Sequence, residues 1–208
     1  KRAALLLLTS LLGALPLAAA FTNTYDLTLS NNFATNEAVF KFTPTNLTHN
    51  RYGENLWLGQ AWTKRIKLSF TNAAVPGDLT NFPVLVHLTN ALIFSSSKAY
   101  GEDLRFTAVD GTNLLSYELE SWDVANRNAL VWVGLPLLSA ASNTTFYLYF
   151  GNSNISTDAS HRGYAPSNTW DTNFRAVWHL RETASGAAGE YLDSTTNTNA
   201  GRGGGGGA

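Results

Sequence analysis

The chain has 208 residues, of which 44% are hydrophobic and only 14% are charged, and its formal net charge is −1. This composition suits a globular domain with a real core rather than a disordered tail. It argues against nucleic-acid binding, which needs a concentrated basic surface, because no basic cluster is larger than the one at residues 64–67. Cysteine is absent, so stability must come from burial and hydrogen bonding.

Residues 1–20 have the pattern of a secretory signal peptide. Lys1-Arg2 precede an apolar run that reaches Leu17, and Ala18–Ala20 supply a small-residue cleavage site. We therefore expect an exported protein, located in the periplasm, at the cell surface or outside the cell, with Phe21 as the first mature residue. The run is shorter than the roughly 20 residues of a spanning helix, so we expect no stable membrane span after cleavage, with a retained anchor as the weaker alternative.

The rest of the chain is typical of an all-β protein. Residues 21–59 form an Asn- and Thr-rich lead-in with one or two expected strands, and residues 64–70 alternate with Ile66, Leu68 and Phe70 on one face. Further strands are expected at 82–88, 103–109, 114–122, 129–133 and 145–150, with a hairpin turn at Asp110-Gly111. No stretch keeps the helical period. The pattern predicts an antiparallel β-sandwich, jelly-roll-like in form.

The expected domain plan follows from these elements. A signal peptide (1–20) and a lead-in (21–59) precede a sandwich domain (60–155), a loop-like linker (156–172) and a final segment (173–208) whose glycine-rich end we expect to be flexible. The predicted core consists of Ile66, Leu68, Phe70, Val84, Val86, Leu104, Phe106, Tyr117, Leu119, Val131, Val133, Tyr147 and Tyr149.

Six segments occur in the order and at the approximate spacing of a known family. They are Trp62-Thr63-Lys64-Arg65-Ile66, Leu79-Thr80-Asn81-Phe82-Pro83-Val84-Leu85-Val86, Gly101-Glu102-Asp103-Leu104-Arg105-Phe106, Tyr117-Glu118-Leu119-Glu120-Ser121-Trp122, Val131-Trp132-Val133 and Tyr147-Leu148-Tyr149-Phe150-Gly151-Asn152. Residues 60–155 thus resemble the exported bacterial and archaeal β-sandwich family known as domain of unknown function 2341. The resemblance supplies no catalytic residue.

A second, shorter resemblance concerns the end of the chain. Ala176–Glu182 and Asp193-Ser194-Thr195 are similar to the opening of a concanavalin A-like, laminin-G-type lectin domain. Members of the family above often precede such a domain. We therefore expect residues 173–208 to be the truncated start of a lectin-like domain, with an open strand at residues 176–180.

Acidic residues on neighbouring strands are the first candidates for chemistry. Asp103, Glu118 and Glu120 could serve acid/base catalysis or bind Ca²⁺. Glu118 and Glu120, however, share the strand face opposite Tyr117, which favours a solvated face with Arg105 as a neighbour. The four histidines lie far apart in the sequence. We therefore predict no enzyme, no catalytic residue, no metal site and no cofactor.

Tryptophan is the better functional indication. Exposed indoles stack on sugar rings while acidic and amide side chains bind sugar hydroxyls. Trp122, in phase with Glu118 and Glu120, is the expected exposed indole. The candidate ligand-binding residues are Trp122, Asp123, Asp103 and Glu120.

Three functions remain open at this point. The first is a non-enzymatic exported binding or adhesion module, related to carbohydrate. The second is a structural or assembly subunit that self-associates through open sheet edges. The third is an ancillary domain of a polysaccharide-degrading enzyme or of an energy-transducing membrane complex.

Overall fold

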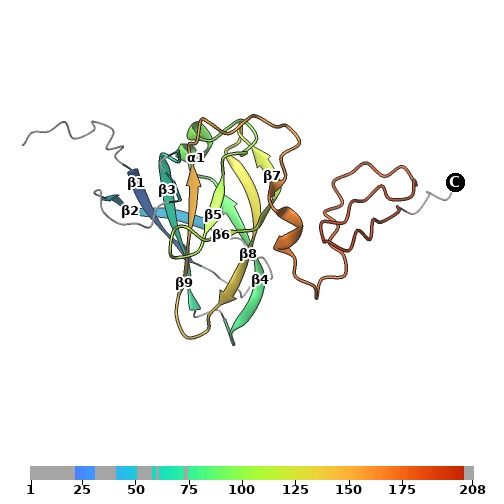
Figure 1. Cartoon of the computed structure of the whole chain (residues 1–208), viewed down its shortest axis with the longest axis horizontal. Coiled ribbons are helices and arrows are strands. Elements are labelled where there is room, and N and C mark those ends of the chain that lie inside the picture. The colour runs from blue at the N-terminus through green and yellow to red at the C-terminus, as the bar shows by residue number, and fades with distance from the viewer. Residues whose placement is uncertain (1–21, 31–40, 51–57, 60, 73–74, 204–208) are drawn as a thin grey trace, which may run out of the picture.

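A computed structural model describes residues 22–30, 41–50, 58–59, 61–72 and 75–203 (Figure 1). The expected signal peptide and the last residues of the glycine-rich end lie outside this part of the chain. None of the described helices is long and apolar enough to cross a membrane.

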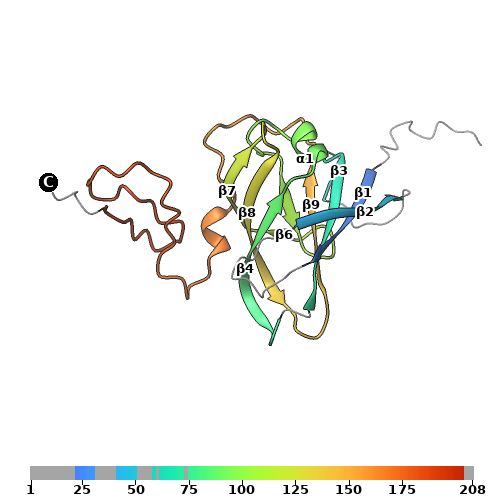
Figure 2. The same ribbon diagram turned by 180° about the vertical axis from the view of Figure 1, so that it is seen from behind.

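Two β-sheets face each other across the core, as Figures 1 and 2 show from opposite sides. The six-stranded sheet has the order β2-β1-β3-β9-β5-β6 and the four-stranded sheet the order β10-β7-β8-β4. All pairs are antiparallel except β1 with β3. The strands are β1 (Thr22–Ser30), β2 (Lys41–Asn50), β3 (Lys64–Phe70), β4 (Leu79–Leu88), β5 (Arg105–Thr107), β6 (Leu114–Leu115), β7 (Tyr117–Asp123), β8 (Asn128–Leu138), β9 (Thr144–Phe150) and β10 (Gly163–Tyr164). The predicted all-β class and sandwich are thereby confirmed.

The core lies between the sheets and contains eleven of the thirteen predicted residues, the exceptions being Tyr147 and Tyr149. The prediction for β9 had the wrong phase. Phe146, Leu148 and Phe150 face the core, whereas Tyr147 and Tyr149 lie on the other face beside Arg65. Tyr149 is nevertheless fully buried, because its hydroxyl donates a hydrogen bond to the Gly111 carbonyl, 2.9 Å away.

The predicted strand at 114–122 is divided between the two sheets. Residues 114–115 pair with β5 in one sheet, and residues 117–123 pair with β8 in the other. Ser116 lies at the crossing, and its carbonyl accepts a hydrogen bond from the Gly134 amide at 2.9 Å. The sequence does not reveal this crossing, because Leu115, Tyr117 and Leu119 keep alternating toward the core on both sides of it.

Strand β7 carries a β-bulge at Glu120. Tyr117 and Leu119 stand opposite Val133 and Val131, but the register then shifts so that Trp122 stands opposite Ala129. An extra residue in one strand reverses the phase of everything after it. Trp122 therefore faces the core side, and the prediction that it shares the face of Glu118 and Glu120 is wrong.

Two short helices occur where none was predicted. Helix α1 (Ala91–Ser96) begins at Asn90, whose side chain accepts a hydrogen bond from the Leu92 amide, and it buries Ile93 and Phe94. The 3-10 helix η2 (Pro166–Thr169) lies in the stretch expected to be loop, together with β10. Both helices are too short to show a hydrophobic period.

Residues 171–203 extend away from the sandwich as a looped segment, which we call the C-terminal segment (Figures 1 and 2). Its strand content is limited to the isolated bridges Trp178↔Asp193 and Tyr191↔Gly201. The open strand expected at residues 176–180 does not form, since Leu180 has a positive φ of 54°.

Leu119→Ala is expected to lower the free energy of unfolding by about 2–4 kcal/mol, because it removes a buried side chain and leaves a cavity. The control is Val124→Ala, whose side chain is 46% exposed in the turn after β7, and its effect should stay below about 0.5 kcal/mol. Urea denaturation measures both variants. Equal losses would contradict the core-facing phase of β7.

Candidate functional site

The outer face of β7 is where the sandwich meets the chain that follows it. Glu118 and Glu120 point outward, away from the core, because Glu118 alternates with Tyr117 and Leu119 and the change of phase comes only after Glu120. This face is not open to solvent, because the side chains of Trp170, His179 and Ser194 lie against it. Glu118 is only 4% exposed. The expectation of a solvated acidic face is therefore wrong.

Two hydrogen-bond donors and one ion-pair partner, from separate parts of the chain, satisfy the Glu118 carboxylate. Trp170 Nε1 donates to Oε2 at 2.7 Å, and Ser194 Oγ donates to Oε1 at 2.6 Å. His179 Nε2 forms an ion pair with Oε2 at 3.2 Å. A buried carboxylate without such partners would be strongly destabilising.

His179 joins the two glutamates. Its Nδ1 forms an ion pair with Glu120 Oε2, which also accepts a hydrogen bond from Trp132 Nε1 at 3.2 Å. Its side chain is 9% exposed. Arg105, expected beside these glutamates, instead donates to the carbonyls of Glu102 and Leu104, so that expectation is wrong.

The proximity of these groups changes their pKa values. The hydrogen bond to Glu118 and then that to Glu120 raise the pKa of His179 to about 9. Burial alone would raise the pKa of Glu118, but the bonds from His179, Ser194 and Trp170 outweigh it and hold that pKa below its usual range. Burial also acts to raise the pKa of Glu120, but the interactions with His179 and Trp132 outweigh burial, so that this pKa is lowered too. At neutral pH the cluster is thus one imidazolium between two carboxylates.

Aromatic packing and one arginine complete the contact. The Trp170 ring lies 5.3 Å from the rings of both Trp132 and Phe174 and 6.1 Å from that of His179. Arg181 Nη1 donates to the carbonyl of Glu120 at 2.8 Å and, at 3.5 Å, to that of Leu119. The beginning of the C-terminal segment is therefore fixed on the sandwich by packing and by charge together.

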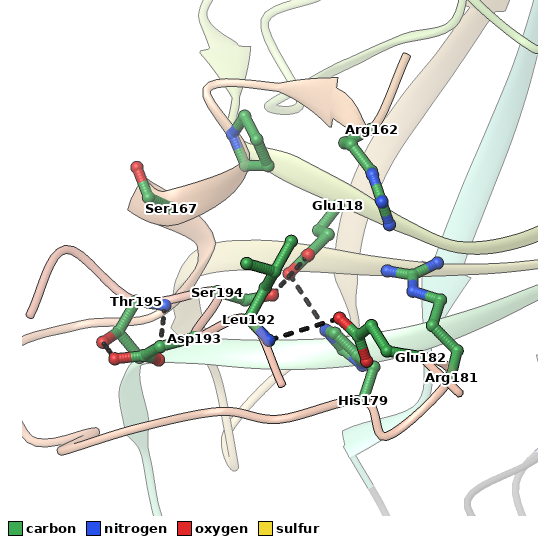
Figure 3. A pocket seen from close by; sticks show the side chains of 11 residues that line it. Glu118, Arg162, Ser167, His179, Arg181, Glu182, Leu192, Asp193, Ser194 and Thr195 are labelled. Atoms are coloured by element: carbon green, nitrogen blue, oxygen red, sulfur yellow. Dashed lines mark hydrogen bonds and ion pairs between the residues drawn. The ribbon is translucent and has the colours of Figure 1, made fainter. Parts of the chain in front are cut away.

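A pocket of about 230 Å³ lies beside this contact (Figure 3). Its walls come from β7, the residues around η2 and two stretches of the C-terminal segment. The lining residues are Glu118, Arg162, Pro166, Ser167, His179, Arg181, Glu182, Leu192, Asp193, Ser194 and Thr195. Asp193 is held in place by hydrogen bonds from the amides of Val177, Thr195 and Asn199. The cavity is lined by more apolar than polar surface, with Arg162 and Arg181 as basic groups and Pro166 and Leu192 as apolar ones.

The structure does not bring the four predicted ligand residues together. Fully buried Asp103 accepts hydrogen bonds from the amides of Lys98, Gly151 and Asn152 at 2.7–3.0 Å. It thereby ties two of the segments that carry the family resemblance to each other. Its contacts are those of a structural residue.

Trp122 and Asp123 are also engaged within the protein. The Trp122 ring is half-buried against Phe94, 4.8 Å away, and its Nε1 donates to the Ala99 carbonyl. Asp123 accepts two hydrogen bonds from Asn126 in the turn after β7. Of the four, only Glu120 takes part in the cluster beside the pocket.

Sequence reasoning missed His179, Trp170, Ser194 and the two pocket arginines. His179 and Ser194 lie in the two stretches that resemble a lectin-like opening, so the short second resemblance was the available signal. Within the described part of the chain, no group of three or more His, Asp or Glu side chains could hold a metal ion.

A known family matches the part of the chain that contains β7. Residues 100–172 match the model of the family described as domain of unknown function 2341 (DUF2341). No curated protein and no solved structure matched the chain. The DUF2341 match runs from the loop before β5 to the residues after η2, so it includes Glu118, Arg162 and Trp170 but not His179, Arg181 or Ser194. The pocket therefore lies between the DUF2341 region and the segment that follows it.

The stability of the protein is expected to fall as the pH rises from 6.5 to 9, because the folded-state pKa of His179 is raised from 6.5 to about 9. A raised pKa stabilises the folded state fully below pH 6.5, and this stabilisation is lost as the pH rises through the folded-state pKa of about 9. The lowered pKa values of Glu118 and Glu120 add stabilisation that is present above 4.5 and lost in acid. Urea denaturation across this range measures the effect.

The variant His179→Gln should flatten the alkaline part of that profile, since glutamine has no proton to lose. His87→Gln, on β4 and hydrogen-bonded to Asn128, is the matched control and should keep it. An unchanged decline in His179→Gln would show that His179 is not the group responsible.

Proposed function

We propose that this chain is a non-enzymatic, exported binding or adhesion module that recognises carbohydrate at the pocket between the sandwich and the C-terminal segment. Export is supported by the signal-peptide pattern of residues 1–20. A lectin-like, jelly-roll continuation is supported by the resemblance of residues 176–182 and 193–195. The proposal depends mainly on the chemistry of the pocket.

The observation that carries the proposal is that Glu118 and Asp193, two of the three pocket carboxylates, are already occupied. Glu118 accepts bonds from Trp170 and Ser194 and pairs with His179. Asp193 Oδ1 and Oδ2 both accept backbone hydrogen bonds. A general acid or base must be able to reach a substrate and exchange a proton with it. These carboxylates serve the fold, which favours binding over catalysis.

The groups that remain accessible are those that bind sugars. Arg162 and Arg181 are exposed donors, Ser167 carries a half-exposed hydroxyl, and Leu192 is a 57% exposed apolar wall. Among the described tryptophans, Trp178 is the exposed one, at 46%. Trp178 does not line the pocket but precedes the pocket residue His179, and we propose its indole as the stacking surface in place of Trp122.

Binding of the folded chain to a glycan array tests this function. We expect retention of at least one class of glycan and no release of reducing ends. Leu192→Asp should weaken the binding, whereas Leu137→Asp, at a 44% exposed leucine of β8, should not. A folded sample that binds no glycan, or one that hydrolyses its ligand, would contradict the proposal.

Assembly through a sheet edge is the second candidate, favoured by β4. This ten-residue strand forms an edge of the four-stranded sheet and carries Phe82, which is 40% exposed. Pro83, without an amide proton, and Asn81, with φ 49°, limit regular pairing. We expect a monomer in size-exclusion chromatography with light scattering. A concentration-dependent oligomer abolished by Phe82→Lys would favour assembly instead.

A further inference from the structure

We propose that the pocket selects acidic sugars, with Arg162 and Arg181 holding the carboxylate of a hexuronate residue. This inference rests on the proposed carbohydrate-binding function and names its ligand class. It is carried by the two arginines, the occupied state of the neighbouring carboxylates, and the shape of the pocket walls.

Arg162 enters the pocket without a partner of its own. Its backbone carbonyl accepts a hydrogen bond from the Leu119 amide at 2.7 Å, which fixes the main chain beside β7. Its guanidinium has no hydrogen bond or ion pair with any described residue. A guanidinium held at the wall of a pocket is suited to bind a carboxylate through two parallel hydrogen bonds.

Arg181 enters from the C-terminal segment and is oriented by β7. Its Nη1 bonds the carbonyls of Glu120 and Leu119, and its other guanidinium nitrogens have no such partners in the described part of the chain. In Figure 3 the guanidinium ends of Arg162 and Arg181 extend toward the same part of the pocket. Two arginines from different segments thus converge on one cavity.

Two of the three pocket carboxylates are engaged by other groups. Glu118 pairs with His179, and Asp193 is saturated by amides and by the Thr195 hydroxyl. Neither arginine forms an ion pair with a carboxylate among the residues described, but the charge of Arg181, after the hydrogen bond from the backbone of Glu182 itself, helps to lower the pKa of the third carboxylate, Glu182. The charge of Arg162 is therefore available to an anionic ligand, and that of Arg181 is shared between the ligand and Glu182.

The remaining walls fit a polyhydroxylated ring rather than a bare anion. Pro166 and Leu192 supply apolar surface for the C–H face of a ring. The half-exposed hydroxyl of Ser167 lines the pocket and can exchange a hydrogen bond with a sugar hydroxyl. A volume of about 230 Å³ accommodates one sugar residue, not a long chain. A hexuronate carries a carboxylate and several hydroxyls on one ring of this size and therefore matches these groups.

Titration calorimetry of the full chain with trigalacturonate and with neutral galactotriose tests this inference. We expect binding of trigalacturonate that weakens with added NaCl, because the arginines are partly exposed, and at least about tenfold weaker binding of galactotriose. Arg162→Gln should reduce trigalacturonate affinity about tenfold. Arg175→Gln, at an exposed arginine of the C-terminal segment that does not line the pocket, should not.

The outcomes separate this inference from the function on which it rests. Equal affinity for both trisaccharides would overturn the acidic-sugar inference and leave carbohydrate binding intact. Equal binding of acetate, or of a peptide through its free C-terminal carboxylate, would show a general carboxylate site and also overturn it. Binding of trigalacturonate that Arg162→Gln leaves unchanged would place the ligand elsewhere. No binding of any saccharide by folded protein would overturn both.

Discussion

The buried carboxylate of Glu118 is the constraint on which the arrangement of the chain after β10 depends. A charge removed from water must be paired or hydrogen-bonded, and here the partners come from residues 170, 179 and 194. These three positions lie 52–76 residues beyond Glu118. Satisfying one carboxylate therefore determines where η2 and the start of the C-terminal segment lie.

The shape of β7 makes this contact possible. At Ser116 the chain passes from one sheet to the other, and the bulge at Glu120 then reverses which side chains of the strand face the core. Two glutamates point outward from one short strand, while Tyr117, Leu119 and Trp122 point to the core. Without the bulge, Trp122 would occupy the outer face and compete with the histidine for space. The bulge thus keeps Trp122 on the core side of β7 and leaves the outer face to the two glutamates.

In the function proposed above, the same contact accounts for recognition rather than catalysis at a site rich in acidic groups. The glutamates neutralise His179 and hold the segment, so arginine and hydroxyl groups remain for a ligand. Polar networks that are satisfied internally rigidify a site. The ionisable side chains that line the pocket are three carboxylates, two arginines and one histidine, and a rigid site of this kind would suit a ligand that is held but not changed.

The sequence by itself determined the class of the fold, because alternation of apolar residues in β3, β4 and β8 is a local property that burial makes unambiguous. It also indicated residues 100–155 of the region matched by the family model, although the resemblance was placed from residue 60 and the match continues to residue 172. It could not determine the phase of β9, since Phe146, Tyr147, Leu148 and Tyr149 are all apolar and either face satisfies the alternation.

Only the tertiary structure decided the site. The bulge at Glu120 changes the face of Trp122 without any local signal, and the donors of Glu118 are too distant in sequence for spacing to reveal them. Asp103 was a candidate ligand-binding residue in the sequence, but in the structure its carboxylate accepts hydrogen bonds from three backbone amides. The strands were predictable because they follow from a local alternation of residues. The pocket was not, because it depends on hydrogen bonds between residues far apart in the sequence.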